Sequence, residues 1–128
     1  MNYLTGKQIL LVHSIIVSET GGIHGVRSHH TVLSLEDLPR QKVFGKELYK
    51  GVFLKASVYM QKIIFEHPFL DGNKRSAMAC SSAFLERNGY RIFVPRGEVE
   101  KFALKVVNKK LDLELIAEWI KLNSKKIK

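Results

Sequence analysis

The sequence predicts an all-α fold, and three observations support this prediction. The 128 residues include only three prolines, and alternating runs of β-branched residues are few. Apolar residues recur three or four positions apart in several segments, as they do on the buried face of a helix. Capping residues and glycines stand at the ends of these segments. We therefore expect a compact bundle of about six helices.

The first two helices are predicted in the N-terminal third of the chain. Thr5 to Gln8 fits a capping box, and apolar residues then continue at helical spacing as far as Val17. Gly21-Gly22 should end this helix. A short helix follows from about His30 to Leu38, because Pro39 disfavours a helical conformation in the residue before it.

The two clearest helices lie in the middle of the chain. A broad apolar stripe predicts a helix from about Glu47 to Glu66, which His67-Pro68 ends. A second helix should begin near Asn73 and stop at Asn88-Gly89. Its side chains are unusually small between Ser76 and Ala83, and small residues allow neighbouring helices to approach closely. We therefore place this helix at the centre of the bundle.

The C-terminal part should contain two more helices. The segment from Tyr90 to Val94 is too short for more than an extended strap. Helices are predicted over about Glu98–Asn108 and Leu113–Leu122, with Asp112 as the N-cap of the last. The lysines of the tail are expected to belong to a frayed, solvated end; they are Lys121, Lys125, Lys126 and Lys128.

Composition narrows the class of protein. The hydrophobic content of 45% argues against disorder, and apolar runs such as Ile9–Val12 are far shorter than the roughly 20 residues of a membrane span. No linker or repeat divides the chain, so residues 1–128 are expected to form one domain. The single cysteine, Cys80, and an N-terminus without an apolar signal core predict a cytoplasmic protein. The net charge of +9 suggests an anionic partner: a nucleotide, a nucleic acid or an acidic protein.

The segment from His67 to Arg75 is the candidate site. It is a loop that ends at a helix N-terminus, where free N–H groups and the helix dipole favour anions. Gly72 would let a phosphate approach the main chain, and Asn73, Lys74 and Arg75 add polar and cationic donors.

Two residues of the same segment could carry the chemistry. Asp71 is a hard oxygen ligand that suits Mg²⁺ beside a phosphate. His67 is the natural general base, because histidine is the residue type suited to proton transfer near neutral pH. Together these residues describe a phosphoryl or nucleotidyl transfer site. The residues alone leave a plain alternative open, in which a histidine before proline ends a helix and Asp-Gly-Asn makes an ordinary turn. The remaining histidines, His13 among them, show no spacing typical of metal binding.

The stretch His67-Pro68-Phe69-Leu70-Asp71-Gly72-Asn73-Lys74-Arg75 resembles the motif of the Fic/Doc superfamily, His-x-Phe-x-Asp/Glu-Gly-Asn-x-Arg. Lys74 after the asparagine is the form seen in the Doc (death-on-curing) branch. Three further segments resemble Doc chains: Gly21 to Arg27, Phe84 to Tyr90, and Leu111 to Ile120. The resemblance thus spans nearly the whole chain, and it implies a Fic/Doc-type helical bundle.

The resemblance also implies roles for the motif residues. His67 would deprotonate a hydroxyl on a target protein, and Asp71 would hold Mg²⁺ on the phosphates of ATP. The phosphate cradle would consist of Gly72, Asn73, Lys74 and Arg75. Fic enzymes mostly transfer AMP and usually have a second arginine where this chain has Met78, and a glycine where it has Lys74.

These two departures favour the Doc reaction, in which the γ-phosphate of ATP is moved. Doc toxins phosphorylate a threonine of elongation factor Tu and stop translation. The resemblance therefore implies an ATP- and Mg²⁺-dependent kinase acting as the toxin of a toxin–antitoxin pair. Two alternatives stay open: a Fic-type nucleotidyl transferase, and a non-catalytic module that binds a partner through its basic surface. Nucleic acid is the less favoured partner, because it leaves the motif unexplained.

Control of the activity should come from another molecule. Many Fic proteins carry an inhibitory helix in which glutamate precedes glycine or asparagine, and no glutamate of this chain does. The resemblance implies an antitoxin whose C-terminal segment folds onto the toxin as a helix. The resemblance also suggests that residues 37–46 act as a flap for the target backbone, although an ordinary surface loop explains them as well.

Overall fold

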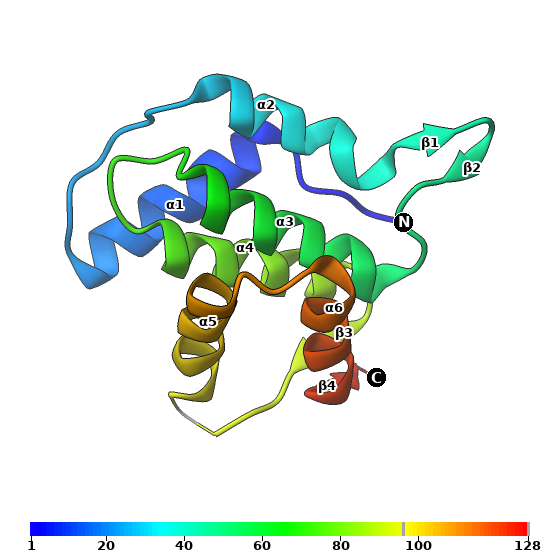
Figure 1. The fold of residues 1–128 in the computed structure, drawn as a ribbon. Coiled ribbons are helices and arrows are strands. Elements are labelled where there is room, and N and C mark those ends of the chain that lie inside the picture. Colours follow the sequence, from blue (N-terminus) through cyan, green and yellow to red (C-terminus); the bar gives the residue numbers. More distant parts are fainter. Residues whose placement is uncertain (96, 128) are drawn as a thin grey trace.

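The computed structural model of the chain describes residues 1–95 and 97–127, and Figure 1 shows how its helices are arranged. The helices are α1 (Gly6–Thr20), α2 (His29–Asp37), the 3₁₀ turn η1 (Leu38–Arg40), α3 (Val52–Glu66), α4 (Asn73–Arg87), α5 (Glu98–Lys109) and α6 (Leu113–Leu122). The strands are β1 (Lys42–Val43), β2 (Lys46–Glu47), β3 (Tyr90–Ile92) and β4 (Ser124–Lys126). The predicted all-α architecture of about six helices is confirmed for the described residues.

The predicted caps position the outer helices. Thr5 accepts a hydrogen bond from the Gln8 amide at 3.1 Å and donates its own amide to the Gln8 side chain at 2.8 Å, so the capping box of α1 is present. The helix ends at Gly21, whose amide donates to the Val17 carbonyl. Asp112 caps α6 by accepting the Leu115 amide at 3.0 Å. Both α1 and α6 therefore begin where a short polar side chain accepts a hydrogen bond from an amide of the first turn.

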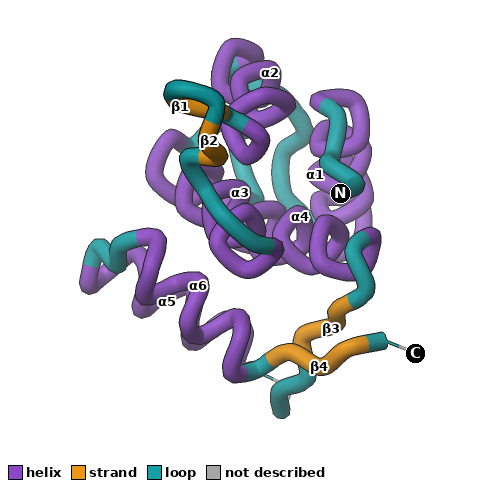
Figure 2. Tube along the Cα trace, turned by 90° about the vertical axis from the view of Figure 1, so that its right-hand side faces the viewer, coloured by secondary structure: helices purple, strands orange, loops and turns teal. Residues whose placement is uncertain are grey.

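Helices α3 and α4 form the centre of the bundle. They pack against each other over their length, α1 covers α4, and α2 and α6 cover α3. Figure 2 shows the pair between α1 and α2 on one side and α5 and α6 on the other. The small residues of α4 allow the close approach that the sequence predicts, since the Ser81 hydroxyl donates directly to the Ala56 carbonyl of α3. Tyr59 of α3 and Phe84 of α4, both fully buried, fill the core between the two helices.

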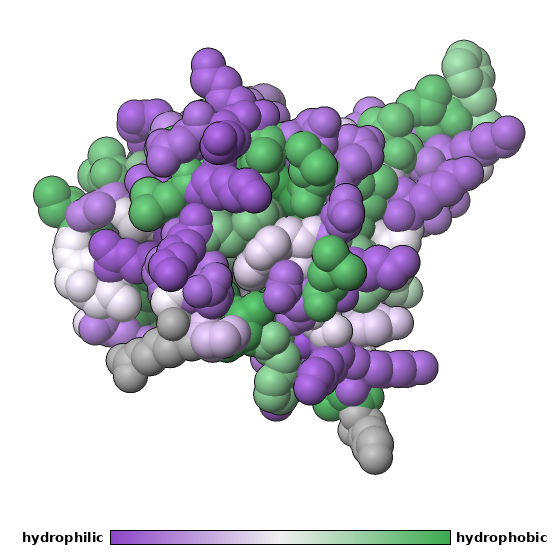
Figure 3. All heavy atoms as spheres, turned by 60° about the horizontal axis from the view of Figure 1, so that its bottom comes forward, coloured by the Kyte–Doolittle hydropathy of each residue, from purple (hydrophilic) through white to green (hydrophobic). Residues whose placement is uncertain are grey.

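The predicted start of the third helix is wrong by five residues. Helix α3 begins at Val52, and Lys46–Glu47 instead pairs antiparallel with Lys42–Val43. The hairpin turns through Phe44 and Gly45, whose φ angles of 51° and 75° both lie in the left-handed region. Gly51, with a φ of 84°, separates this hairpin from the helix. Figure 3 shows the hairpin projecting from the body of the molecule, with hydrophobic and hydrophilic side chains next to each other.

The expected frayed tail is also wrong for Lys121, which lies in α6, and for Ser124–Lys126. The latter residues form β4, which pairs antiparallel with β3, so the predicted strap at Tyr90 to Val94 is one half of a small sheet. Backbone hydrogen bonds close both ends of the pair: Phe93 donates to Asn123 at 2.7 Å, and Ile127 donates to Gly89 at 2.8 Å. Lys128 lies outside the described residues. No described helix is both long and apolar enough to cross a membrane.

Candidate active site

The loop of residues 67–72 joins the C-terminus of α3 to the N-terminus of α4. His67 is the C-cap of α3, and its amide donates to the Ile63 carbonyl at 3.2 Å. Its φ of 49° lies in the left-handed region, which costs a non-glycine residue on the order of 1 kcal/mol. The His67 side chain is exposed, so this proton acceptor is accessible from solvent.

Asn73 shapes this loop from within. Its side-chain oxygen accepts from the Phe69 amide, and its side-chain nitrogen donates to the Phe69 carbonyl, both at 3.0 Å. Phe69 itself is 1% exposed and anchors the loop in the core. In this structure, the Asn73 side chain therefore bonds to the loop backbone, whereas the sequence suggested that it would contact phosphate.

Helix α4 begins with free amides that point to the loop. Gly72, with φ 72° and ψ 23°, is its N-cap, and no described side chain caps this end of the helix. The Gly72 carbonyl accepts the Ser76 amide at 2.9 Å, so the amides of Asn73, Lys74 and Arg75 precede the first intrahelical bond. These three donors and the positive end of the helix dipole make an anion site.

Asp71 lies beside this anion site and is held by two backbone donors. Its Oδ1 accepts from the Gly72 amide at 2.8 Å, and its Oδ2 accepts from the Ile23 amide at 3.2 Å. The Ile23 amide, followed by that of Gly72, lowers the pKa of the carboxyl group below its usual value of 3.8. The group is therefore ionised near neutral pH, and each oxygen keeps a lone pair for a cation.

The donor set fits Mg²⁺ in the manner of a nucleotide site. Mg²⁺ is commonly bound by one or two carboxylates, with phosphate oxygens and water completing its coordination. Asp71 supplies one such carboxylate. The described residues contain no group of three or more histidines, cysteines and acidic residues that could hold a metal by themselves. Phosphate oxygens and water would supply the remaining ligands.

All the predicted site residues line one small cavity. Its volume is about 200 Å³, and it is lined by His67, Leu70, Asp71, Gly72, Asn73, Lys74 and Arg75. This is the volume of roughly seven water molecules, enough for phosphate groups but not for a whole nucleotide. Lys74 and Arg75 are both exposed, and the Arg75 guanidinium donates to the Thr20 hydroxyl at the end of α1.

The glycine-rich loop of residues 21–28 is tied to the site by its backbone. The Arg27 and Ser28 amides donate to the Pro68 carbonyl at 2.7 and 2.9 Å, and Leu70 donates to Gly25 at 3.1 Å. A Cβ on Gly22 would lie 2.7 Å from Asp71 Oδ2, and one on Gly25 would lie 2.5 Å from Leu70 Cδ1. A larger residue at either position would therefore have to displace the Asp71 or Leu70 side chain.

Sequence reasoning missed His13, which lies under the loop. The residue is 3% exposed, and its Nε2 is 2.8 Å from the Asp71 carbonyl oxygen. Its ring stacks on Phe69, with a centroid distance of 3.7 Å and an interplanar angle of 5°. The available signal was its place on the buried face of α1, four residues from both Ile9 and Val17.

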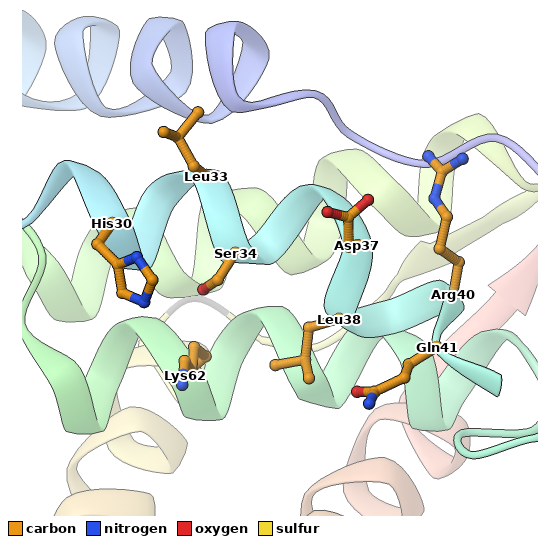
Figure 4. A pocket seen from close by; sticks show the side chains of 8 residues that line it. All are labelled: His30, Leu33, Ser34, Asp37, Leu38, Arg40, Gln41 and Lys62. Carbon is orange, nitrogen blue, oxygen red and sulfur yellow. The ribbon is translucent and has the colours of Figure 1, made fainter. Parts of the chain in front are cut away.

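Two regions that could compete with this site lack its chemistry. A larger groove of about 660 Å³ lies between α2, η1 and α3, and Figure 4 shows the eight residues that line it. Its Lys62 is paired with Glu66 at 2.9 Å, and its lining includes none of the motif residues 67–75. The β1–β2 hairpin lies at the other end of α3 from His67 (Figure 1). Because this helix has 15 residues and is about 22 Å long, the structure does not place the expected flap beside the site.

Comparisons with known proteins agree with the motif. A sequence model of the Fic/DOC family matches residues 3–85. The chain is 31% identical over 90 residues to "Toxin Doc" of Mycolicibacterium smegmatis, covering 70% of this chain and 67% of that protein. It is 25% identical over 93 residues to "Protein kinase doc" of Escherichia phage P1, covering 73% of each. The matched family region includes every residue that lines the cavity.

Proposed function

The chain belongs to the Fic/DOC family, and we propose that it is a Doc-like toxin that transfers the γ-phosphate of ATP to a serine or threonine hydroxyl of a translation factor such as elongation factor Tu. The observation that carries the proposal is the convergence of His67, Asp71 and the α4 N-terminus on one cavity. The names of the two relatives, a toxin and a protein kinase, support the same function.

His67 is the proposed general base. Its exposed side chain can meet a hydroxyl on a large protein substrate without any opening of the fold. The imidazole takes the hydroxyl proton as the oxygen attacks the γ-phosphorus. The bond from that phosphorus to the β–γ bridging oxygen then breaks, and ADP leaves. General base catalysis of this kind contributes about 10²- to 10⁴-fold to a rate.

The rest of the site would bind and orient the phosphates. The free amides of α4 donate to phosphate oxygens, and Lys74 and Arg75 neutralise their charge. Asp71 is the residue that would hold Mg²⁺, which when bound supplies further neutralisation of the phosphate charge. The nucleoside would extend out of the 200 Å³ cavity into solvent.

Met78 favours phosphate transfer over AMP transfer. A second arginine at this position would be needed to grip the phosphates in the Fic manner. The Met78 side chain is 6% exposed and belongs to the hydrophobic core, so it leaves no polar group there. Lys74, by contrast, is exposed at the cavity. These two positions support a nucleotide orientation in which the γ-phosphate faces His67.

A cognate antitoxin is the second proposed partner. The relative named "Toxin Doc" supports this proposal, and the net charge of +9 would favour encounter with an acidic segment.

A label-transfer assay tests the proposal. Purified protein, Mg²⁺ and elongation factor Tu are incubated with ATP that is labelled at either the α- or the γ-phosphate. We expect label on the target from γ-labelled ATP alone, and none with His67→Ala. Label from the α-phosphate would identify a nucleotidyl transferase instead. If neither label is transferred to this target, the proposed substrate is wrong.

A further inference from the structure

The buried histidine of α1 has no part in the chemistry described above, yet it contacts the backbone of the site. A histidine that is 3% exposed in a hydrophobic environment needs a hydrogen-bond partner, because an unpaired buried polar group is costly. The partner of His13 is the main-chain carbonyl of Asp71, at 2.8 Å. The bond crosses 58 positions of sequence and joins α1 to the motif loop.

The direction of this hydrogen bond follows from its acceptor. A carbonyl oxygen can only accept, so Nε2 of His13 carries the hydrogen. The donor therefore holds the peptide group that joins Asp71 to Gly72. The amide of this same peptide group donates to Asp71 Oδ1 at 2.8 Å. A single peptide unit is thus fixed at its oxygen by His13 and at its nitrogen by the carboxylate.

The ring of His13 also supports the loop from below. It stacks on Phe69, whose amide and carbonyl are both bonded to Asn73. Below Gly72, a Cβ would lie 4.0 Å from His13 and 3.4 Å from Val17 Cγ2. Residues 69–73 thus rest on one face of α1.

We propose that His13 is a positioning residue for Mg²⁺ and the nucleotide phosphates. By holding the Asp71–Gly72 peptide group, it sets the direction of the Asp71 carboxylate and of the first α4 amides at the same time. This inference rests on the proposed function, because it assigns His13 to the phosphate-binding half of that site. His13 does not touch the substrate, and it acts only through the loop.

Two substitutions separate the hydrogen bond from the packing. His13→Phe keeps a stacked aromatic ring but removes the donor. His13→Gln removes the ring, but its amide nitrogen can reach the position of Nε2. We expect His13→Phe to raise both the KM for ATP and the half-saturating Mg²⁺ concentration about tenfold, with the KM for the protein substrate unchanged. His13→Gln should stay within about threefold of the wild type in both.

Comparing the change in kcat with the change in each KM distinguishes a positioning role of His13 from a loss of stability. A variant that is merely less folded contributes fewer active molecules, which lowers the apparent kcat and leaves each KM unchanged. A wild-type KM for ATP in His13→Phe would overturn the proposal. So would an equal defect in His13→Gln, because the donor would then not be the group that matters.

A second measurement does not depend on the reaction. In the free protein, His13→Phe should speed amide hydrogen exchange at residues 69–75 about tenfold and leave exchange in α6 unchanged, whereas His13→Gln should not. If wild-type protein binds no Mg²⁺–ATP in a calorimetric titration, the proposed function fails, and the exchange result still decides whether His13 orders the loop. Unchanged exchange in His13→Phe would overturn the positioning role.

Discussion

The two ends of α3 each carry a loop that is fixed by a buried polar side chain, but only one of the loops leaves groups free for chemistry. At the N-terminal end, Lys55 is fully buried and donates to the carbonyls of Pro39, at 3.2 Å, and Tyr49. It also pairs with Glu47 of the hairpin at 3.0 Å. At the C-terminal end, His13 donates to the Asp71 carbonyl.

The two loops differ in which polar groups keep capacity for a further partner after each loop has been fixed. In the hairpin, Lys55 and Glu47 satisfy each other, and the tip displays Phe44, which is completely exposed. In the motif loop, the Asp71 carboxylate and the first amides of α4 keep capacity for a ligand. Similar anchoring therefore gives a structural element at one end of the helix and the proposed binding site at the other.

The largest effect is expected from His67→Ala. Loss of the general base should lower the rate of transfer at least about a hundredfold, while Mg²⁺–ATP binding stays nearly unchanged because the phosphate-binding groups are intact. Initial-rate assays and calorimetry measure the two quantities. His29→Ala, which removes an exposed histidine outside the cavity, is the matched control. Full activity in His67→Ala would show that another group accepts the proton.

Lys55→Ala tests the N-terminal end of α3, and the quantity to measure is the free energy of unfolding. The substitution leaves two carbonyls and Glu47 without their donor and should cost about 2–3 kcal/mol of unfolding free energy. Urea denaturation measures this value, and Lys50→Ala, at an exposed lysine nearby, should change it by less than about 0.5 kcal/mol. The rate of transfer by folded Lys55→Ala should be normal. A specific loss of ATP binding would mean that the two ends are not independent.

Gly22→Ala tests the contact between the glycine-rich loop and Asp71. The added Cβ would lie 2.7 Å from Asp71 Oδ2, so the carboxylate must move. We expect the half-saturating Mg²⁺ concentration to rise about tenfold. Gly21→Ala is the control, because Gly21 also has a positive φ, of 85°, but a Cβ there meets nothing within 4 Å. Equal effects of the two substitutions would point to backbone strain alone.

The ionisation of Asp71 should appear in the pH dependence of stability. Because its pKa is lower in the folded protein than in the unfolded chain, the carboxylate stabilises the fold above its usual value of 3.8. This stabilisation should be lost as the pH falls from that value through the folded-state pKa. Denaturation of wild type and Asp71→Asn across acidic pH measures it. If the difference in unfolding free energy between the two proteins does not decrease at acidic pH, the hydrogen bonds from the two backbone amides do not stabilise the ionised form of Asp71.

The smallest effect is expected at the tip of the hairpin. Phe44 has a φ of 51°, and asparagine tolerates this conformation better than phenylalanine does. Phe44→Asn should therefore raise the unfolding free energy by up to about 1 kcal/mol and leave transfer to elongation factor Tu unchanged. A rise in the KM for the protein substrate would show that the hairpin contacts the target after all, as the resemblance to Fic folds suggested.

Much of this arrangement follows from local sequence signals. Thr5 and Asp112 predict helix starts because a cap depends only on its neighbours in the chain, and His67-Pro68 predicts the end of α3 for the same reason. The motif resemblance places every predicted site residue on the cavity, and the structure brings all of them together.

The missed features depend on contacts between distant segments. The hairpin turn uses Phe44-Gly45, which lacks the Asn-Gly or Asp-Gly signal of a two-residue turn, and its anchor is a lysine of α3. Strand β4 is rich in lysine and becomes a strand only through pairing with β3, more than 30 positions earlier. The role of His13 requires knowing that α1 passes beneath the motif loop.

Phosphoryl transfer that depends on His67 can be tested by mass spectrometry of intact elongation factor Tu after incubation with this protein, ATP and Mg²⁺. We expect the target to gain the mass of one phosphoryl group, and to gain nothing when His67 is replaced by alanine. A gain equal to AMP, or a phosphoryl gain that survives in His67→Ala, would contradict this expectation.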